Sequence, residues 1–319
     1  MEQGEGEGLT REQRRFFNAH GYIVLRGAVP SELCTDVLER ADRRRTKMQR
    51  DGSWGKVKDF NFPRLGKSDA LFSLVRAPRV AAAMEQLLGA GSVALPPRGV
   101  VKWVGKRRAS SERGAGGGEA SGTSLAHARL NATELDVWQD YWHIDGAGNS
   151  HLLTLKQRSD GLTGAQLRGG LRVGKSRTGG SVLNFSLLCG VFLHDIPQPW
   201  RGNFTVWPGA HHACMALIAE RGLDSFIRER PSFAALCAMA EARCAGGVAT
   251  PHPAPVQLCV QQGDVVLAHP LLPHAAGWNF DAPGRFATYF RVRHAEHDVL
   301  REKVLDGDLW RELRAAEVD

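Results

Sequence analysis

The chain lacks the cysteine spacing of a zinc ribbon or a disulfide framework. Its 319 residues contain six cysteines, none of them in a Cys-x-x-Cys pair. No apolar run reaches the length of a membrane-spanning helix, and the first residues form neither the basic nor the apolar part of a signal peptide. The last three residues are not the Ser-Lys-Leu peroxisomal address. We therefore expect reduced thiols in a soluble, cytoplasmic protein.

A phosphate-loop motif is present without the context that it needs. Residues 169–176 read Gly-Gly-Leu-Arg-Val-Gly-Lys-Ser, which matches G-x-x-x-x-G-K-[ST]. Such a loop follows a hydrophobic strand and opens a helix. Here Leu-Thr-Gly-Ala-Gln lies before the match and Arg-Thr-Gly-Gly after it. We interpret the match as a coincidence within a glycine-rich segment.

Positive charge exceeds negative charge, with 41 Lys and Arg against 34 Asp and Glu and a pI near 9.3. Such an excess fits an anionic partner, either nucleic acid or a charged metabolite. Much of it falls in two glycine-rich segments, 105–133 and 156–180, whose composition is typical of solvated loops. This distribution disfavours nucleic acid and leaves an anionic small-molecule substrate open. We expect no membrane partner and favour a monomer.

Periodicity and turn signals divide the chain into a helical first part and a strand-rich remainder. Thr10 and Gln13 form a capping-box pattern for a helix that ends at Gly21. Further helices are expected from Ser31, in two pieces within 68–89, from 213 to about 244, and from 298 to about 316. Strands are expected at 22–25, 93–104 with a break at Pro96-Pro97, 181–193, 202–207, 256–260 and 265–269. Short strands at this density predict a sandwich or barrel of largely antiparallel sheet.

A histidine and a carboxylate stand two residues apart at His143 and Asp145, after the apolar-rich run 135–142. On a strand, such residues face the same side and can offer a nitrogen and an oxygen to one metal ion. With a second histidine they would form the 2-His-1-carboxylate set of non-haem Fe(II) oxygenases. Another His-x-Glu pair occurs at His294 and Glu296, so the pair alone does not identify a site.

Four segments, in order, resemble the phytanoyl-CoA dioxygenase family of Fe(II)/2-oxoglutarate oxygenases. They are Phe16 to Arg26, Trp142-His143-x-Asp145, Gly202-x5-Pro208-Gly209-Ala210-His211, and Gly263-Asp264-x4-His269-Pro270-x3-His274 with Arg285 beyond. The resemblance implies a double-stranded β-helix with a jelly-roll core, and iron bound by His143, Asp145 and a distal histidine. It also implies 2-oxoglutarate and O2 as co-substrates, with ascorbate as a reductant.

The resemblance also implies one domain over 1–319. It divides into a helical part at 9–92, a strand core at 93–293 and a C-terminal helix at 294–319. The core carries loop insertions at 105–133 and 156–180 and a helical insertion at 213–245.

Two histidines compete for the distal position. His274 stands 11 residues before Arg285, the spacing at which the family places the arginine that binds the distal carboxylate of 2-oxoglutarate. The same step from His269 reaches Phe280, which cannot pair with a carboxylate. The resemblance favours His274, with His269 as a packed neighbour or the alternative ligand.

The remaining candidates have alternatives in ordinary packing. Arg285 can bind a carboxylate through two nitrogens and stays charged when buried, but it could also be a surface arginine after a turn. Lys102 is either a second cation for the co-substrate or an outward-facing edge lysine. Thr205 and Thr288 could place a hydroxyl near the co-substrate or face the core. Trp142 is expected to pack near the metal.

The implied reaction is hydroxylation of a small organic substrate, with release of succinate and CO2. Retention of Asp145 argues against halogenation. The family's Pro-Gly-Ser-His turn reads Pro-Gly-Ala-His here, and with no peroxisomal address phytanoyl-CoA itself is disfavoured. The alternative function is a non-catalytic or 2-oxoglutarate-independent, cupin-like metal-binding protein.

Overall fold

The computed structural model describes residues 8–52, 69–104, 144, 172–173, 176–177, 185–229, 255–277, 279 and 284–297. Trp142, His143 and Asp145 lie outside this part of the chain. So do most of the two loop insertions, the second half of the helical insertion and the expected C-terminal helix. The predictions made for those residues, and the division into parts, stay predictions.

The described residues form five helices, and the last of them begins three residues before the expected start at 213. They are α1 (Arg11–His20), α2 (Ser31–Arg50), α3 (Asp69–Arg76), α4 (Pro78–Leu88) and α9 (Ala210–Glu229). At α1 the expected capping box is present, since Gln13 N donates to Thr10 Oγ1 over 3.1 Å and Thr10 N donates to Gln13 Oε1 over 2.9 Å. Gly21 ends the helix with a φ of 78°, a conformation that glycine adopts without strain.

The larger sheet has five antiparallel strands in the order β1-β8-β5-β10-β2. Their bounds are β1 (Tyr22–Leu25), β2 (Val93–Val104), β5 (Leu187–Phe192), β8 (Val265–Ala268) and β10 (Arg285–His294). Helix α1 leads into β1 and helix α4 leads into β2, the two edge strands of this sheet, and the central strands come from the C-terminal half.

The smaller sheet has three antiparallel strands in the order β7-β6-β9. They are β6 (Phe204–Val206), β7 (Val256–Gln257) and β9 (His274–Ala276). A separate pair, β3 (Arg172–Val173) and β4 (Ser176–Arg177), is antiparallel. This pairing falls on the residues that match the phosphate-loop motif, and it is not the arrangement of strand, loop and helix that such a motif requires.

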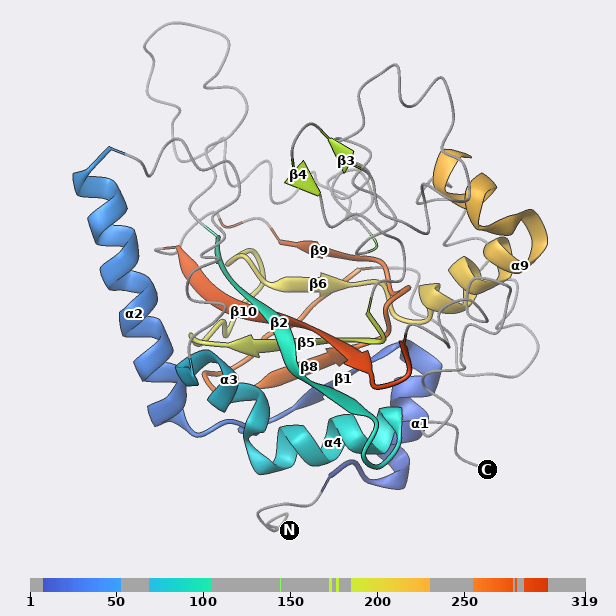
Figure 1. Ribbon diagram of the computed structural model, residues 1–319, viewed down its shortest axis with the longest axis horizontal. Coiled ribbons are helices and arrows are strands. Elements are labelled where there is room, and N and C mark those ends of the chain that lie inside the picture. The colour runs from blue at the N-terminus through green and yellow to red at the C-terminus, as the bar shows by residue number, and fades with distance from the viewer. Residues whose placement is uncertain are drawn as a thin grey trace, which may run out of the picture.

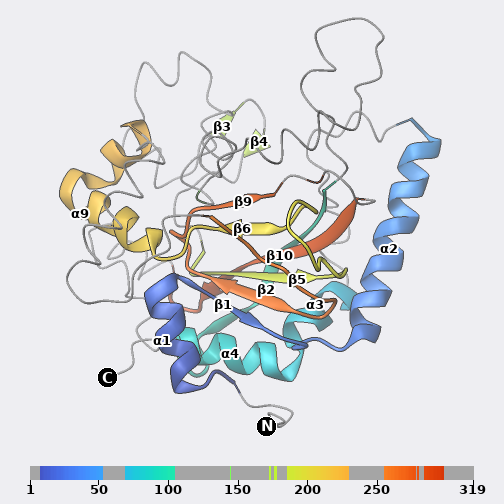
Figure 2. The same ribbon diagram turned by 180° about the vertical axis from the view of Figure 1, so that it is seen from behind.

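Two apolar cores explain the layers of the molecule. One lies between the larger sheet and helices α1 to α4, and the other lies between the two sheets. Figures 1 and 2 show the smaller sheet on one side of the larger sheet and α3 and α4 on the other, with α2 along one edge. Side chains alternate along each strand, so membership of a core tells which face a residue occupies.

The two prolines do not end β2 as expected. The strand runs unbroken from Val93 to Val104, but its pairing with β10 shifts between Arg291 and Arg293. Arg98 lies opposite Arg291 and Ala94 lies opposite Arg293. Over this stretch, which includes the prolines, β2 therefore contains two more residues than β10. Proline has no N–H to donate to the ladder, and the strand accommodates it as a bulge.

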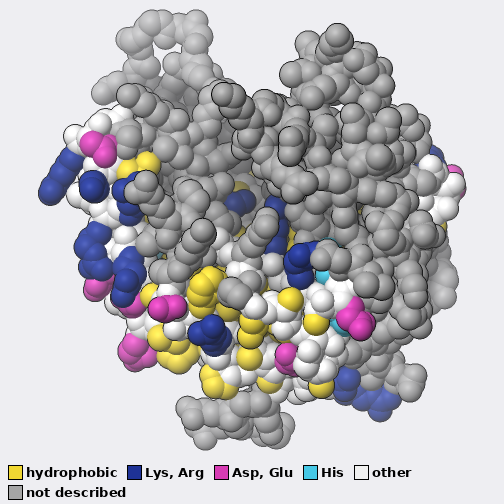
Figure 3. Space-filling view, in the orientation of Figure 1, with side chains coloured by type: hydrophobic (Ala, Val, Ile, Leu, Met, Phe, Trp, Pro, Cys, Tyr) yellow, Lys and Arg dark blue, Asp and Glu magenta, His cyan; other side chains and the backbone are white. Residues whose placement is uncertain are grey.

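The basic run from Arg40 to Lys47 on α2 lies at the surface and pairs with acidic neighbours. Arg40 Nε lies 2.8 Å from Asp36 Oδ1, and Arg43 Nη1 lies 3.2 Å from Glu39 Oε2. Figure 3 shows basic and acidic side chains interspersed along this helix. Across the described residues, no helix is long and apolar enough to cross a membrane.

Candidate metal and co-substrate site

His274 faces the space between the two sheets. It opens β9 directly opposite Val206, a member of the inter-sheet core, and its side chain is 6% exposed. Its ring centroid lies 5.2 Å from that of Phe204. The strand pairing therefore places an imidazole inside the jelly roll.

The hydrogen bond at Nδ1 decides which nitrogen of His274 can bind a metal. Nδ1 lies 2.9 Å from the carbonyl oxygen of Leu272, which can only accept, so Nδ1 carries the proton. This tautomer has its lone pair on Nε2. A backbone carbonyl that orients a ligating imidazole in this way is common at metal sites.

Arg285 is buried on the inner face of the larger sheet. It is 3% exposed, and it lies on the same face of β10 as Ala287 and Tyr289, both members of the inter-sheet core. The alternative of a surface arginine is therefore wrong. Its Nε donates to the carbonyl oxygen of Gly202, on the segment that leads into β6.

The two terminal nitrogens of Arg285 are buried and find no hydrogen-bond acceptor among the residues that the structure describes. A buried cation without acceptors is costly. A guanidinium presents two parallel N–H groups, which match the two oxygens of a carboxylate. The group that fits these nitrogens is therefore a carboxylate or a similar anion.

Lys102 lies on the same face as Arg285. It stands opposite Ala287 across the β2–β10 ladder, and its Nζ lies 5.6 Å from the centre of the Tyr289 ring. That ring lies 5.6 Å from the ring of Phe204, which in turn contacts His274. Lys102 is half-buried and faces inward, so the alternative of an outward-facing lysine does not hold, although β2 is an edge strand.

The two threonines are not brought to this face. Thr288 lies on the same face of β10 as Phe286 and Phe290, which belong to the core on the helical side. Its Oγ1 donates to the carbonyl oxygen of Val191 over 3.3 Å. Thr205 stands between Phe204 and Val206, which belong to the inter-sheet core, so its side chain faces the other side of the smaller sheet. Its Oγ1 donates to the carbonyl oxygen of Asn203 over 3.4 Å. Both hydroxyls serve the backbone instead.

His269 lies in a cluster of histidines beside the end of α1. Its N–H donates to the carbonyl oxygen of Gly21 over 2.8 Å, and its Nδ1 accepts from the N–H of Leu271 over 3.1 Å. Its ring centroid is 5.1 Å from that of His211, which is 4.0 Å from that of His212. These contacts describe a packed neighbour, as the sequence favours.

Burial favours the neutral form of His269 and of His211. The loss of water around His269, and then the charge of His212, lowers its pKa to about 3. Burial also holds the pKa of His211 well below its ordinary value, with further contributions from His212 and His269. Both His211 Nε2 and His212 Nε2 donate to the carbonyl oxygen of Asn18, over 3.2 and 2.9 Å.

Sequence reasoning missed His194, which follows β5 near Arg285. Burial and then the charge of Arg285 lower the pKa of His194, while Asp195 and Asp42 oppose the shift. Its ring lies nearly parallel to that of Phe286, at an interplanar angle of 17° and 6.3 Å between centroids. The signal was present as a polar His-Asp pair at the end of a long apolar strand.

The described residues supply one of the three expected metal ligands. Among them, no group of three His, Cys, Asp or Glu residues is placed to hold a metal ion. His143 and Asp145, the other two expected ligands, lie outside the described residues. Where the structure can be compared with the expectation, at His274 and Arg285, donor types and orientation fit a metal ion and a carboxylate.

No protein-family model matches the sequence, and neither does any curated protein. Among solved structures, EctD from S. alaskensis, crystallised with bound iron, has a TM-score of 0.53 and 14% identity over 91% of this chain and 78% of that chain. HygX from Streptomyces hygroscopicus, with nickel and 2-oxoglutarate bound, has a TM-score of 0.47 and 18% identity over 89% of this chain and 86% of its own.

SnoK, a non-haem α-ketoglutarate-dependent carbocyclase from nogalamycin biosynthesis, has a TM-score of 0.47 and 15% identity, covering 90% of this chain and 84% of that chain. At such identities the similarity bears on the fold alone. The match to EctD, together with the two antiparallel sheets, confirms the double-stranded β-helix that the sequence predicts.

Proposed function

We propose that this protein is an Fe(II)- and 2-oxoglutarate-dependent dioxygenase, similar to the phytanoyl-CoA dioxygenase family. In this proposal it hydroxylates a small organic substrate and releases succinate and CO2. His143, Asp145 and His274 would hold the iron, and Arg285 and Lys102 would bind the distal carboxylate of 2-oxoglutarate. The iron with its co-substrates supplies the oxidising power of the reaction, and ascorbate would serve as its reductant.

One observation carries the proposal. Arg285 is buried on the inner face of the jelly roll, with both terminal nitrogens lacking an acceptor in the described part of the chain. Folding would not retain a guanidinium there without an anion to match it. The histidine that stands 11 residues earlier faces the same space, in the tautomer that carries its lone pair on Nε2.

The contribution of the chain itself is placement. The carbonyl of Leu272 fixes the ring of His274, and the carbonyl of Gly202 fixes the guanidinium of Arg285. Phe204 and Tyr289 line the space between them and exclude water from it. A low-dielectric surrounding strengthens the attraction between a carboxylate and the two cations.

We further propose a substrate that carries negative charge. Arg291 follows Arg285 by six residues on the same face of β10, and its guanidinium lies 5.5 Å from the centre of the Phe185 ring. Figure 3 shows basic side chains inside the recess at the middle of this face of the molecule. A recess lined by cations favours anionic ligands.

Calorimetric titration of 2-oxoglutarate into anaerobic, Fe(II)-loaded protein tests the proposal. We expect micromolar binding that requires the metal and is lost in His143→Ala and in Arg285→Ala. Arg40→Ala, which removes an exposed arginine from α2, is the matched control and should bind as the wild type does. Succinate release would then serve to screen substrates.

The rival function is a cupin-like metal-binding protein that does not use 2-oxoglutarate. It would bind Fe(II) or another divalent metal with undiminished affinity in Arg285→Ala. If the wild type binds metal but not 2-oxoglutarate, this rival replaces the proposal.

A further inference from the structure

The turn that receives Arg285 has an uncommon backbone. Trp200 has a φ of 66°, the only positive value at a residue other than glycine in the part of the chain that the structure describes, and Gly202 has a φ of 76°. A bulky residue rarely adopts this conformation, and where it does, the surroundings impose it, often at a functional site.

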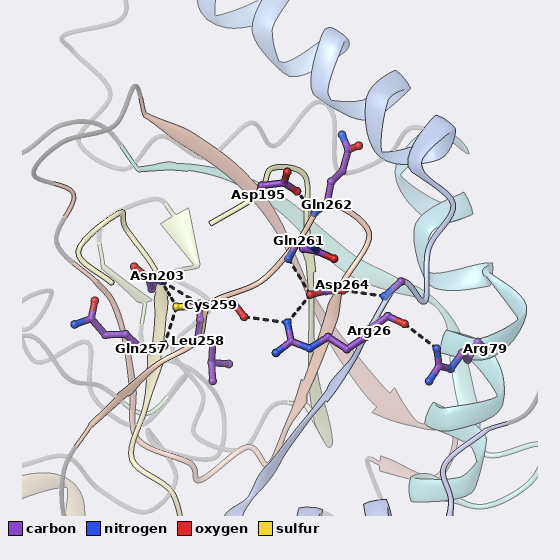
Figure 4. A network of polar contacts seen from close by, with 11 residues as sticks. Arg26, Arg79, Asp195, Asn203, Gln257, Leu258, Cys259, Gln261, Gln262 and Asp264 are labelled. Carbon is purple, nitrogen blue, oxygen red and sulfur yellow. Dashed lines mark hydrogen bonds and ion pairs between the residues drawn. The ribbon is translucent and has the colours of Figure 1, made fainter. Parts of the chain in front are cut away.

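Side-chain hydrogen bonds impose this conformation on the turn. Asn203 is fully buried. Its Oδ1 accepts from the N–H of Arg201 over 3.0 Å, and its Nδ2 donates to the carbonyl oxygens of Gln198 and Leu258, each over 3.1 Å. Figure 4 shows Asn203 beside Leu258 and Cys259, on the segment that follows β7. One amide thus closes the turn on itself and ties it to the segment that follows β7.

Three further contacts anchor the turn from outside. The N–H of Trp200 donates to Gln257 Oε1 over 2.8 Å. Arg201 forms an isolated antiparallel bridge with Asn279, and the N–H of Gly277 donates to the carbonyl oxygen of Asn203 over 2.7 Å. The turn is therefore fastened to segments on both sides of it, and its carbonyl groups have fixed directions.

The carbonyl of Gly202 is directed at Nε of Arg285. A guanidinium is planar, so a fixed Nε–H also fixes the plane and the direction of the two terminal N–H groups. These are the nitrogens that find no acceptor among the described residues. A rigid turn on the smaller sheet thereby controls the aim of a cation that belongs to the larger sheet.

We propose that the turn Trp200–Asn203 is a positioning device for Arg285, with Asn203 as its central positioning residue. It holds the guanidinium in the orientation that binds the distal carboxylate of 2-oxoglutarate through both terminal nitrogens. This inference rests on the proposed function for the identity of the anion. Asn203 touches neither iron nor co-substrate and acts through the carbonyl of Gly202.

The first test measures 2-oxoglutarate affinity in Asn203→Ala. With the turn released, the dissociation constant should rise about tenfold, while the affinity for Fe(II) stays unchanged. In an Arg285→Lys background, where no guanidinium remains to be aimed, Asn203→Ala should change the constant by less than about twofold. Equal effects in the two backgrounds would overturn the proposal.

A milder variant and a matched control guard against a merely structural effect. Gln257→Leu removes the acceptor for Trp200 without touching Arg285, and should weaken 2-oxoglutarate binding in the same direction. Gly91→Ala places a side chain at another positive φ, 72°, with open space around it. It should lower the melting temperature and leave the affinity as it is. An affinity loss in Gly91→Ala that matches the loss in Asn203→Ala would contradict a positioning role.

A readout without co-substrate separates this inference from the proposed function. The Nε–H of Arg285, assigned by its absence from the nitrogen-15 spectrum of Arg285→Lys, should exchange slowly with solvent in the wild type and quickly in Asn203→Ala. If the wild type binds no 2-oxoglutarate, the proposed function fails and the exchange rate alone decides the positioning role. Slow exchange in both proteins would overturn it.

Discussion

Two histidines five residues apart have opposite surroundings. His274 lies between the sheets with Nδ1 donating to a backbone carbonyl, a tautomer that suits a metal ligand. His269 lies beside the end of α1, where its Nδ1 accepts from a backbone N–H and its ring packs on His211. Both are almost fully buried, so burial does not tell them apart.

The difference lies in what orients each ring. A donating Nδ1 places the lone pair on Nε2, whereas an accepting Nδ1 places the proton there. Within one short segment, the chain thus holds one imidazole in a tautomer that suits a metal ligand and another in a packed cluster of histidines. The two histidines should therefore respond differently to the same substitution.

The largest expected effect is the loss of metal-dependent binding in His274→Ala. Removal of one of three ligands should lower the affinity for Fe(II) by about 100-fold or more, and 2-oxoglutarate binding should vanish with it. Calorimetry under anaerobic conditions measures both. A variant that still binds metal as the wild type does would show that His274 is not the distal ligand.

His269→Ala should show the converse. Truncation of a buried, hydrogen-bonded ring should lower the free energy of unfolding by about 2–4 kcal/mol, measured by urea denaturation. The affinity for Fe(II) should stay within about twofold of the wild type once the variant is folded. If the two variants exchange these outcomes, His269 is the ligand and His274 the packed residue.

Acid should destabilise the protein through the cluster around His269. Burial lowers the pKa of His269 to about 3 and keeps the pKa of His211 well below its usual range. In the unfolded state a histidine has a pKa of about 6.5. Between about pH 6.5 and about pH 3 the unfolded state therefore binds more protons, and the unfolding free energy falls as the pH falls.

Each histidine that stays neutral should contribute a slope of about 1.4 kcal/mol per pH unit within that window. Urea denaturation at a series of pH values measures the slope, and His269→Gln should make it shallower. An unchanged slope in that variant would mean that His269 takes up a proton in the folded state.

Lys102→Met should weaken 2-oxoglutarate binding by about fivefold, because the inner face loses its second cation. Arg291→Met removes a cation farther along the same face and serves as the comparison. It should spare 2-oxoglutarate and reduce the affinity for an anionic substrate. Equal losses of 2-oxoglutarate affinity would show that only the overall charge of the face matters.

The smallest effect is expected at Thr288. Thr288→Val removes a hydroxyl that donates to Val191 on the helical side of the sheet. It should lower the unfolding free energy by about 1 kcal/mol and change 2-oxoglutarate affinity by less than about twofold. A larger change in affinity would mean that the hydroxyl reaches the inner face.

Much of the fold could be predicted from local signals. The capping box at Thr10 and the glycine after α1 act within a few residues of themselves, and α1 begins and ends where they predict. The break expected at Pro96 was wrong because the ladder with β10 runs on past the prolines. Pairing between distant strands supplied what the local signal could not.

The residue types of the candidate site could be predicted from the sequence. The face of the sheet on which each residue lies was harder to predict. The spacing from His274 to Arg285 identified both residues, and the structure places both inside the jelly roll. The sequence could not show that Lys102 faces inward while Thr288 faces the helices, because the face depends on the register with β5 and β10. The role of Asn203 depends on contacts over 55 residues of chain.

The bulge in β2 has a consequence for how the molecule meets other copies of itself. Within the described strands, β2 forms one edge of the larger sheet. An open edge is a template on which another chain can add a strand and begin an aggregate. Near the bulge, Pro96 and Pro97 have no N–H to offer such a strand, and the ladder register shifts beside them. The irregular ladder at this edge therefore offers an incoming strand an incomplete template.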